Sequence, residues 1–130
     1  MTTWNKLRIA IVGSRTFTNK SYFEEKVLEL IEPFIKQGIT IEVVSGGAKG
    51  TDTLAEQFAK DKGFLFKCFP ADWETFGRSA GVRRNKEIIR YTNANNNGLV
   101  IAFWDFKSPG TKSTIQLARL ASIPIEIVEI

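Results

Sequence analysis

The stretch that most constrains the fold of this chain is residues 45–52, Ser-Gly-Gly-Ala-Lys-Gly-Thr-Asp, called the glycine turn below. Residues 41–44 before it are largely apolar and typical of a buried strand, and Leu54, Ala55 and Phe58 after it have helical spacing. A strand, a glycine turn and a helix in this order direct backbone N–H groups at a bound anion. The sequence therefore predicts a phosphate or nucleotide site here, and the simpler interpretation is a tight turn between strand and helix.

The same alternation of apolar runs and helical patterns continues along the chain. Strands are predicted at residues 7–12, 39–44, 64–69, 99–104 and 123–130, and helices at 20–36, from the glycine turn to 62, at 82–91 and from 111 to 121. Pro33 should kink the first helix or end it early. Near-continuous apolar runs are typical of parallel strands covered on both faces. The predicted fold class is therefore α/β, a small doubly wound (Rossmann-like) sandwich with a mostly parallel five-stranded sheet.

Parallel strands joined by right-handed crossovers all end at one edge of the sheet, where ligands bind at the topological switch point. Four connections should share this edge: residues 13–17, 45–52, 70–81 and 104–111. The third of them is long and contains two aromatic residues and two glycines, which is typical of a binding loop.

The composition restricts the chemistry available at that edge. A chain of 130 residues favours one domain, residues 1–130, with a single core. It has no histidine and one cysteine, Cys68, which argues against Ser-His-Asp and Cys-His catalysis, a metal site and an internal disulfide. No cofactor is expected. The sequence shows neither a signal-peptide pattern nor an apolar run of about 20 residues, so we expect a cytoplasmic location and no membrane contact.

Several basic residues lie in or next to the four connections, which favours an anionic ligand there, although the net charge is only +4. Arg15 is the strongest candidate, because it directly follows a strand and a glycine and a guanidinium gives phosphate two parallel hydrogen bonds. Arg78 and Arg84 are further candidates, although arginines of this segment also have nearby acidic residues with which to pair. Gly110 and Thr111 begin the fourth predicted helix and offer free N–H groups and a hydroxyl to a phosphate.

Carboxylates and aromatic residues at the same edge are candidates for contacts with a sugar and a base. Asp52 and Asp72 have the chemistry to accept hydrogen bonds from ribose hydroxyls, although the helix dipole alone would also favour Asp52 in a first turn. The rings of Trp73 and Trp104 are candidates for stacking on a base. Core packing is the ordinary alternative for such aromatic residues.

The chain resembles, over nearly its whole length, the YspA-like, cpYpsA-related branch of the SLOG superfamily, which also contains the LOG phosphoribohydrolases and the DNA-processing protein of natural transformation. The resemblance rests on residues 13–15, 45–52, 69–73 and 77–81, on Arg84-Asn85 and on Gly110-Thr111. It implies a Rossmann-like fold, a nucleotide or nucleotide-derived ligand, a homo-oligomer, and occurrence in bacteria and phages, often in conflict-related contexts. The candidate ligand-binding residues are then Gly13, Ser14, Arg15, Ser45, Gly46, Gly47, Asp52, Asp72, Trp73, Arg78, Arg84, Asn85, Trp104, Gly110 and Thr111.

The sequence departs from the LOG enzymes at their catalytic glutamate, in the turn Gly-Gly-x-Gly-Thr-x-x-Glu. Residues 109–111 keep part of this turn, but the glutamate position is Thr114. A threonine neither donates a carboxyl proton nor stabilises an oxocarbenium ion. The sequence thus favours binding without cleavage, in a sensor or sequestering protein for an ADP-ribose derivative or a cyclic nucleotide.

Two alternatives remain open from the sequence. The first is a nucleotide hydrolase that cleaves an N-glycosidic bond, for which Asp72 is the candidate catalytic carboxylate. The second is a protein that binds single-stranded DNA, and the modest net charge and the lack of an extended basic stripe in the sequence count against it.

Overall fold

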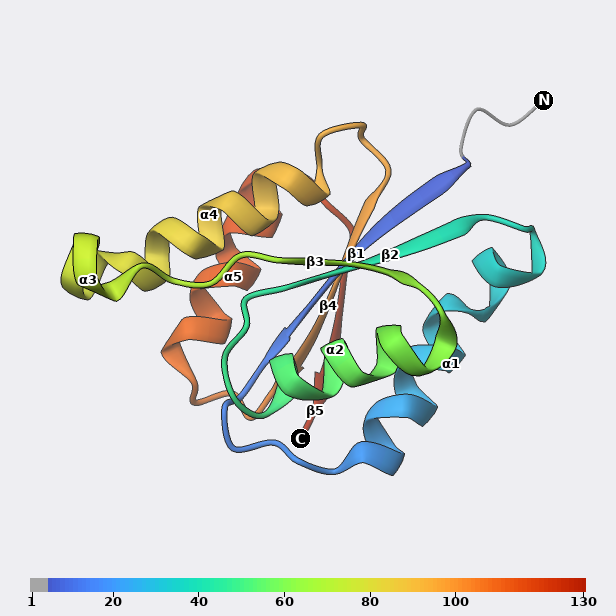
Figure 1. Cartoon of the computed structure of the whole chain (residues 1–130), viewed down its shortest axis with the longest axis horizontal. Coiled ribbons are helices and arrows are strands. Elements are labelled where there is room, and N and C mark those ends of the chain that lie inside the picture. The colour runs from blue at the N-terminus through green and yellow to red at the C-terminus, as the bar shows by residue number, and fades with distance from the viewer. Residues whose placement is uncertain (1–4) are drawn as a thin grey trace.

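A computed structural model describes residues 5–130 and shows a five-stranded sheet between two layers of helices (Figure 1). The strands are β1 (Lys6–Gly13), β2 (Thr40–Ser45), β3 (Leu65–Cys68), β4 (Gly98–Trp104) and β5 (Ile125–Glu129), all parallel and in the order β3-β2-β1-β4-β5. This confirms the α/β, Rossmann-like prediction. From β1 the chain adds β2 and then β3 on one side of the sheet, and it then returns to add β4 and β5 on the other side of β1. The switch point therefore lies between β1 and β4.

The helices divide between the two faces of the sheet. They are α1 (Lys20–Lys36), α2 (Thr51–Lys62), α3 (Trp73–Phe76), the 3₁₀ turn η1 (Gly77–Ser79), α4 (Ala80–Thr92) and α5 (Pro109–Leu120). Side chains of α1 and α2 bury one face of the sheet, and those of α4 and α5 bury the other. None of the helices within residues 5–130 combines the length and the apolar character needed to cross a bilayer.

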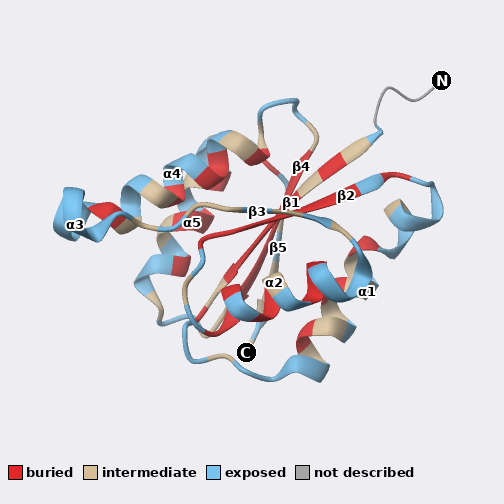
Figure 2. Ribbon diagram, in the orientation of Figure 1, coloured by how far each residue is buried: buried red, intermediate tan, exposed pale blue. Residues whose placement is uncertain are grey.

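Alternation along β1 explains how one strand serves both cores. Ile9 and Ile11 face α1 and α2, where they pack with Phe23, whereas Ala10 and Val12 face α4 and α5. All of these residues are buried, and Figure 2 shows the central strands buried along most of their length. Because both faces of this strand are buried, apolar and polar residues do not alternate along it, and its sequence is a nearly continuous apolar run.

The first helix has the predicted bounds, but the early end expected at Pro33 was wrong, and so was a wholly irregular connection over residues 70–81. Helix α1 continues through Pro33 to Lys36, because the proline removes only one backbone hydrogen bond near the end of the helix while Phe34 beyond it still packs on the core. Residues 70–81 are not simply a loop, since they contain α3 and η1, and α4 begins at Ala80 rather than at residue 82. The signal for α3 is Asp72, whose Oδ1 accepts a hydrogen bond from the Thr75 N–H at 3.1 Å.

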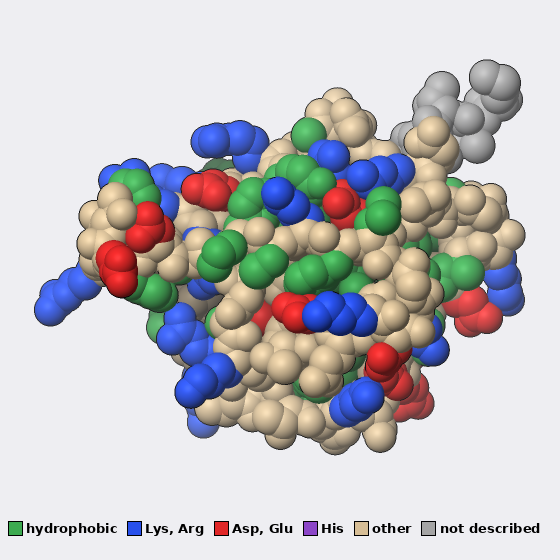
Figure 3. Space-filling model, viewed as in Figure 1, with side chains coloured by type: hydrophobic (Ala, Val, Ile, Leu, Met, Phe, Trp, Pro, Cys, Tyr) green, Lys and Arg blue, Asp and Glu red, His purple; other side chains and the backbone are tan. Residues whose placement is uncertain are grey.

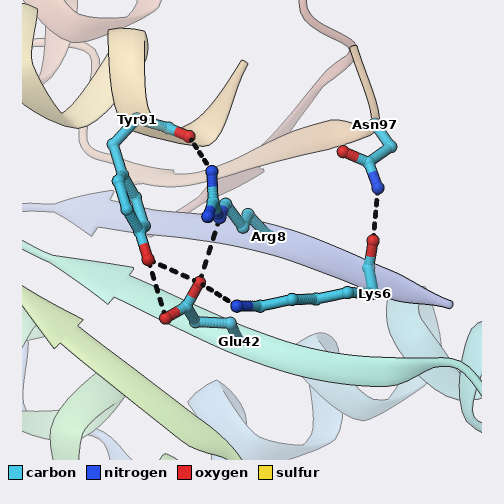
Figure 4. A network of polar contacts seen from close by, with 5 residues as sticks. All are labelled: Lys6, Arg8, Glu42, Tyr91 and Asn97. Carbon is cyan, nitrogen blue, oxygen red and sulfur yellow. Dashed lines mark hydrogen bonds and ion pairs between the residues drawn. The ribbon is translucent and has the colours of Figure 1, made fainter. Parts of the chain in front are cut away.

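A polar network that the sequence did not reveal joins β1, β2 and the end of α4, near the amino-terminal ends of the strands (Figure 4). Glu42 is its centre: Arg8 Nε lies 3.1 Å and Lys6 Nζ 3.2 Å from its Oε1, and the Tyr91 hydroxyl lies 2.9 Å from each carboxylate oxygen. The Arg8 guanidinium also covers the Tyr91 ring, 3.9 Å from its centroid. Burial alone would raise the pKa of Glu42, but the hydrogen bonds from Tyr91, Lys6 and Arg8 outweigh it and lower that pKa.

We expect Glu42→Gln to lower the free energy of unfolding by about 1 kcal/mol at pH 7, because Gln keeps the hydrogen-bond geometry and loses the charge. Because folding lowers the pKa of Glu42, its carboxylate stabilises the protein at pH values above 4.5, the ordinary pKa of a glutamate. This stabilisation disappears as the pH falls through the pKa of Glu42 in the folded protein. Urea denaturation at pH 7 and at pH 3 measures the difference. A gap between the two proteins that is as large at pH 3 as at pH 7 would contradict this account.

Candidate functional site

A pocket of about 520 Å³ lies at the carboxyl ends of β1 and β4, at the switch point of the sheet. It is lined by the β1–α1 connection, the glycine turn, one face of α4, and the β4–α5 connection with the first turns of α5. The lining residues are Val12, Gly13, Ser14, Arg15, Thr16, Gly46, Ala48, Asp52, Arg84, Asn85, Ile88, Asp105, Ser108, Pro109, Gly110, Thr111 and Thr114. Three of the four connections expected at this edge therefore contribute, whereas residues 70–81 supply none of the lining.

Two glycines bring the first two connections together. A Cβ at Gly13 would lie 2.6 Å from Thr51 Oγ1 in the glycine turn, and a Cβ at Gly50 would overlap the Arg15 carbonyl group. Thr51 completes this contact, because its N–H and its hydroxyl both donate to the Ser14 carbonyl oxygen, at 3.1 and 2.9 Å. These glycines therefore allow the β1–α1 connection and the glycine turn to pack directly against each other.

The amino-terminal end of α5 forms one wall of the pocket. Asp105 fixes the approach to it, since its Oδ1 accepts hydrogen bonds from the N–H groups of Lys107 and Ser108 at 2.9 and 2.8 Å, and these bonds hold the pKa of Asp105 below its ordinary value. The first-turn N–H groups of a helix have no acceptor within the helix. Apart from its own helix, no described residue places an atom within 4 Å of a Cβ built on Gly110. A ligand therefore has room to approach the backbone of Gly110 and Thr111.

Two arginines supply positive charge to the pocket. Arg15 is exposed at its rim, and in the described part of the chain neither an ion pair nor a side-chain hydrogen bond occupies its guanidinium. Arg84 is half-buried and fixed, with Nη1 donating to the Gly46 carbonyl oxygen at 2.7 Å and Nε donating to Asn85 Oδ1 at 2.9 Å. Burial lowers the pKa of Arg84, and the neighbouring charge of Asp52 opposes that shift.

Asp52 places a buried carboxylate in the same pocket. Only 9% of the residue is exposed, and its Oδ2 accepts a hydrogen bond from the Ala48 N–H at 3.0 Å. Burial raises the pKa of Asp52, although the Ala48 N–H and the charges of Arg84 and Arg15 partly offset the effect. A carboxylate in this position has further lone pairs with which to accept hydrogen bonds from a hydroxylated ligand.

Trp73 does not line the pocket, but it lies against the first turn of α4. Its indole is about half exposed, and a Cβ at Gly81 would lie 3.3 Å from its Cη2 atom. Gly81, Arg84 and Ile88 occupy successive turns on one face of α4. The ring therefore covers the pocket-lining face of α4 one turn before Arg84.

The other candidate residues outside the lining have local structural contacts. Asp72 caps α3, and Arg78 is exposed in η1. Ser45 is fully buried at the end of β2, and Gly47 has a φ of +72° and packs against Cys68, whose Sγ lies 2.7 Å from the position of a Cβ. The indole N–H of Trp104 donates to the Ser108 carbonyl oxygen at 3.1 Å, so this residue supports the start of α5.

Thr16, Ala48 and Ser108 are pocket residues that the sequence analysis did not single out. Thr16 shares a hydrogen bond with Ser14, whose Oγ lies 2.9 Å from the Thr16 Oγ1. The signal for Ser108 was available, because serine followed by proline and a helical pattern is typical of a helix start. No sequence pattern marks Thr16 or Ala48 as a site residue. They line the pocket because they belong to the two connections that form its wall.

Residues 7–76 match the profile of the YspA, cpYpsA-related SLOG family (YAcAr). The chain is also similar to the Gene 61 protein of Mycobacterium phage D29, with 31% identity over 123 residues that cover 91% of this chain and 93% of that protein. This chain belongs to the YspA, cpYpsA-related SLOG family. Membership in this SLOG family supports nucleotide-related binding or processing.

The part of the chain that matches the family profile contains only some of the pocket. The β1–α1 connection and the glycine turn lie within residues 7–76, whereas Arg84 and the start of α5 lie beyond them. The alignment with the phage protein, which is of similar length, extends over a larger share of the chain. The SLOG assignment thus rests most directly on β1, β2 and their two connections.

Proposed function

We propose that this SLOG protein binds a nucleotide-derived small molecule, of the ADP-ribose or cyclic nucleotide type, and retains it without cleavage as a sensor or sequestering protein. The observation that carries the proposal is the convergence of Arg15, the start of α5 and Asp52 on one pocket at the switch point. A volume of about 520 Å³ is within the range of small-molecule sites. The phage relative is consistent with a role in conflict between phage and host.

The phosphate of the ligand binds between Arg15 and the first turn of α5. Gly110 leaves room for close approach to the backbone, Thr111 adds N–H and hydroxyl donors, and the helix dipole favours an anion. Ser14 lies beside them with its hydroxyl in the pocket wall. Arg84 contributes a second positive charge to the pocket, and its hydrogen bonds to Gly46 and Asn85 hold it in place.

The sugar and the base bind on the side of the pocket toward Asp52. The buried carboxylate accepts hydrogen bonds from ribose hydroxyls, and its charge balances that of Arg84. Trp73 offers its half-exposed ring to a base that extends along the face of α4 beyond Arg84. Gly46 permits this arrangement, since a Cβ there would lie 2.5 Å from Arg84 Nη1.

Retention of the ligand follows from the residue at the position of the LOG glutamate. Thr114 is buried in the pocket wall, and its hydroxyl donates to the Gly110 carbonyl oxygen at 3.3 Å. Asp72, the candidate carboxylate for a hydrolase, caps α3 instead of lining the pocket. Glycoside cleavage ordinarily needs two carboxylates on either side of the bond, and here Asp105 is already engaged by two backbone N–H groups.

Mass spectrometry of the small molecules released when the purified protein is denatured tests the proposal directly, because a tight ligand survives purification. Calorimetry with a panel of nucleotides, cyclic nucleotides and ADP-ribose then measures affinity, and chromatography of the mixtures detects products. An intact ligand supports retention. Released base or ribose phosphate would assign a hydrolase, and no binding across the panel would reject the proposal.

We expect Arg15→Ala to weaken binding of the ligand found by that panel about tenfold, because one charge-assisted phosphate contact is lost, while the exposed Arg15 side chain forms no ion pair with any residue from 5 to 130. Lys49→Ala is the matched control, since Lys49 is an exposed cation in the glycine turn that does not line the pocket. Calorimetry of both variants measures the difference. Undiminished affinity in Arg15→Ala would remove Arg15 from the site.

A further inference from the structure

The two helix layers of this protein carry opposite charge. Helices α1 and α2 hold five basic and seven acidic residues, a formal charge of −2. Helices α3, α4 and α5 with η1 hold seven basic and two acidic residues, a formal charge of +5. The positive net charge of +4 therefore comes mainly from the layer that contains α3, η1, α4 and α5. This layer is strongly basic although the net charge of the whole chain is modest.

Part of this charge forms a row along the outer face of α4. Arg83, Lys86 and Arg90 are all exposed and lie three and four residues apart, so they form one line about 10 Å long. Together with Ser79, Val82 and Glu87 they line a shallow groove of about 380 Å³. Lys and Arg side chains gather along the upper-left margin of the molecule, over α4 (Figure 3). We call Arg83, Lys86 and Arg90 the basic row.

The basic row is separate from the pocket and largely unneutralised. Arg84, on the same helix, points the other way and bonds to Gly46, whereas the row faces outward. Glu87 is the one carboxylate in the groove, and among residues 5–130 it forms no ion pair with the three basic side chains. The fold thus places three basic residues of one helix on a single outward-facing line.

Exposed apolar surface adjoins the amino-terminal end of the row. Phe76 and Val82 are 43% and 47% exposed, and the Arg83 guanidinium lies 4.3 Å from the centroid of the Phe76 ring. Helix α3, which carries Phe76, projects beyond the sheet at the left of Figure 1. A flat guanidinium beside an exposed aromatic ring gives an unpaired base a surface on which to stack, and it offers an acidic peptide no equivalent contact.

We propose that the outer face of α4 binds single-stranded nucleic acid, with backbone phosphates on the basic row and a base stacked against Phe76. The unpaired strand is favoured over a duplex because base pairing and stacking within a duplex hide the faces that Phe76 would contact. This site is independent of the pocket. Loss of one leaves the other in place, so the two proposals are tested separately.

Fluorescence anisotropy with labelled 20-nucleotide oligothymidylate, titrated at several salt concentrations, tests the proposal. The variant Arg83→Gln/Lys86→Gln/Arg90→Gln should bind at least tenfold more weakly at low salt. Its plot of log affinity against log salt should be less steep by about 2, because three phosphate contacts are lost at about 0.7 each. Phe76→Ala should weaken binding severalfold and leave this slope unchanged.

The matched control is Lys20→Gln/Lys36→Gln/Lys62→Gln, which removes three exposed cations from α1 and α2. It changes the net charge by the same amount, so it should bind like the original protein. No binding at low salt, equal losses in both triple variants, tighter binding to a 20-base-pair duplex, or equal binding to a polyglutamate peptide would each overturn the proposal. Binding of the pocket ligand should be the same in all these variants.

Discussion

Replacing Gly50 with Ala is expected to lower the free energy of unfolding by about 3 kcal/mol or more, which would leave a marginally stable protein. Gly50 has a φ of 70° and a ψ of −121°, a backbone conformation that residues with a Cβ avoid. The new Cβ would also overlap the carbonyl group of Arg15 and lie 2.6 Å from the Ser14 carbonyl oxygen. Both obstacles are backbone atoms, so relief requires the β1–α1 connection to move.

The same movement should abolish ligand binding in the Gly50→Ala protein, because Ser14 and Arg15 belong to the pocket. Urea denaturation followed by circular dichroism measures the stability, and calorimetry measures the affinity. Gly63→Ala is the control, since Gly63 also has a positive φ, 71°, but among residues 5–130 no atom beyond its chain neighbours lies within 4 Å of its Cβ position. Its expected cost is only about 1 kcal/mol. Equal destabilisation in the two variants would show that contact with the Arg15 carbonyl is unimportant.

Gly50 also shows which part of the site the sequence could predict. The pattern of a strand, glycines and a helix was enough to place residues 45–52 at the carboxyl edge of the sheet, because connectivity and handedness alone put that turn there. The role of each glycine was not predictable. Gly13 and Gly50 are needed for contact between two connections far apart in the sequence, and a sequence pattern does not show which backbone atoms approach each other.

The fold was more predictable than the site for a related reason. Strands such as β4 (Gly98–Trp104) are buried on both faces, so six consecutive residues, 98–103, share the same buried environment and the signal accumulates. A pocket residue depends instead on one side-chain direction. Trp73 and Asp72 were candidates because they follow β3, yet α3 turns them away from the pocket lining, and the start of a four-residue helix is marked only by its cap.

The charge distribution of the surface was missed for a third reason. A net charge of +4 is the sum of two layers with opposite charge, and only the three-dimensional arrangement separates them. The residues of the basic row alternate along α4 with residues that face the sheet or the pocket, such as Arg84 and Ile88. They become neighbours only when the helix forms.

The second large effect is expected at Asp52, where stability and binding should change in opposite directions. Burial raises the pKa of Asp52 above its ordinary value of 3.8. Between pH 3.8 and the raised pKa of the folded protein, the folded protein binds more protons than the unfolded chain. The free energy of unfolding therefore falls as the pH rises from 3.8 through that raised pKa. Asp52→Asn, whose amide oxygen can still accept from the Ala48 N–H, should therefore be more stable than the original protein at pH 7 and equally stable near pH 3. Each unit of pKa shift contributes about 1.4 kcal/mol to this difference.

Binding should nevertheless weaken roughly 10- to 100-fold in Asp52→Asn, because a charged acceptor is worth more to a sugar hydroxyl than a neutral amide oxygen. Calorimetry with the ligand and urea denaturation at pH 3 and pH 7 measure the two effects on one protein. Asp61→Asn is the control: Asp61 is exposed, pairs with Lys20 at 3.7 Å, and should change neither quantity appreciably. Groups with perturbed pKa values cluster at functional sites, which is one reason to expect that Asp52 serves a purpose besides stability. If Asp52→Asn is more stable and binds as tightly as before, that purpose is not ligand binding and the sugar contact must be assigned elsewhere.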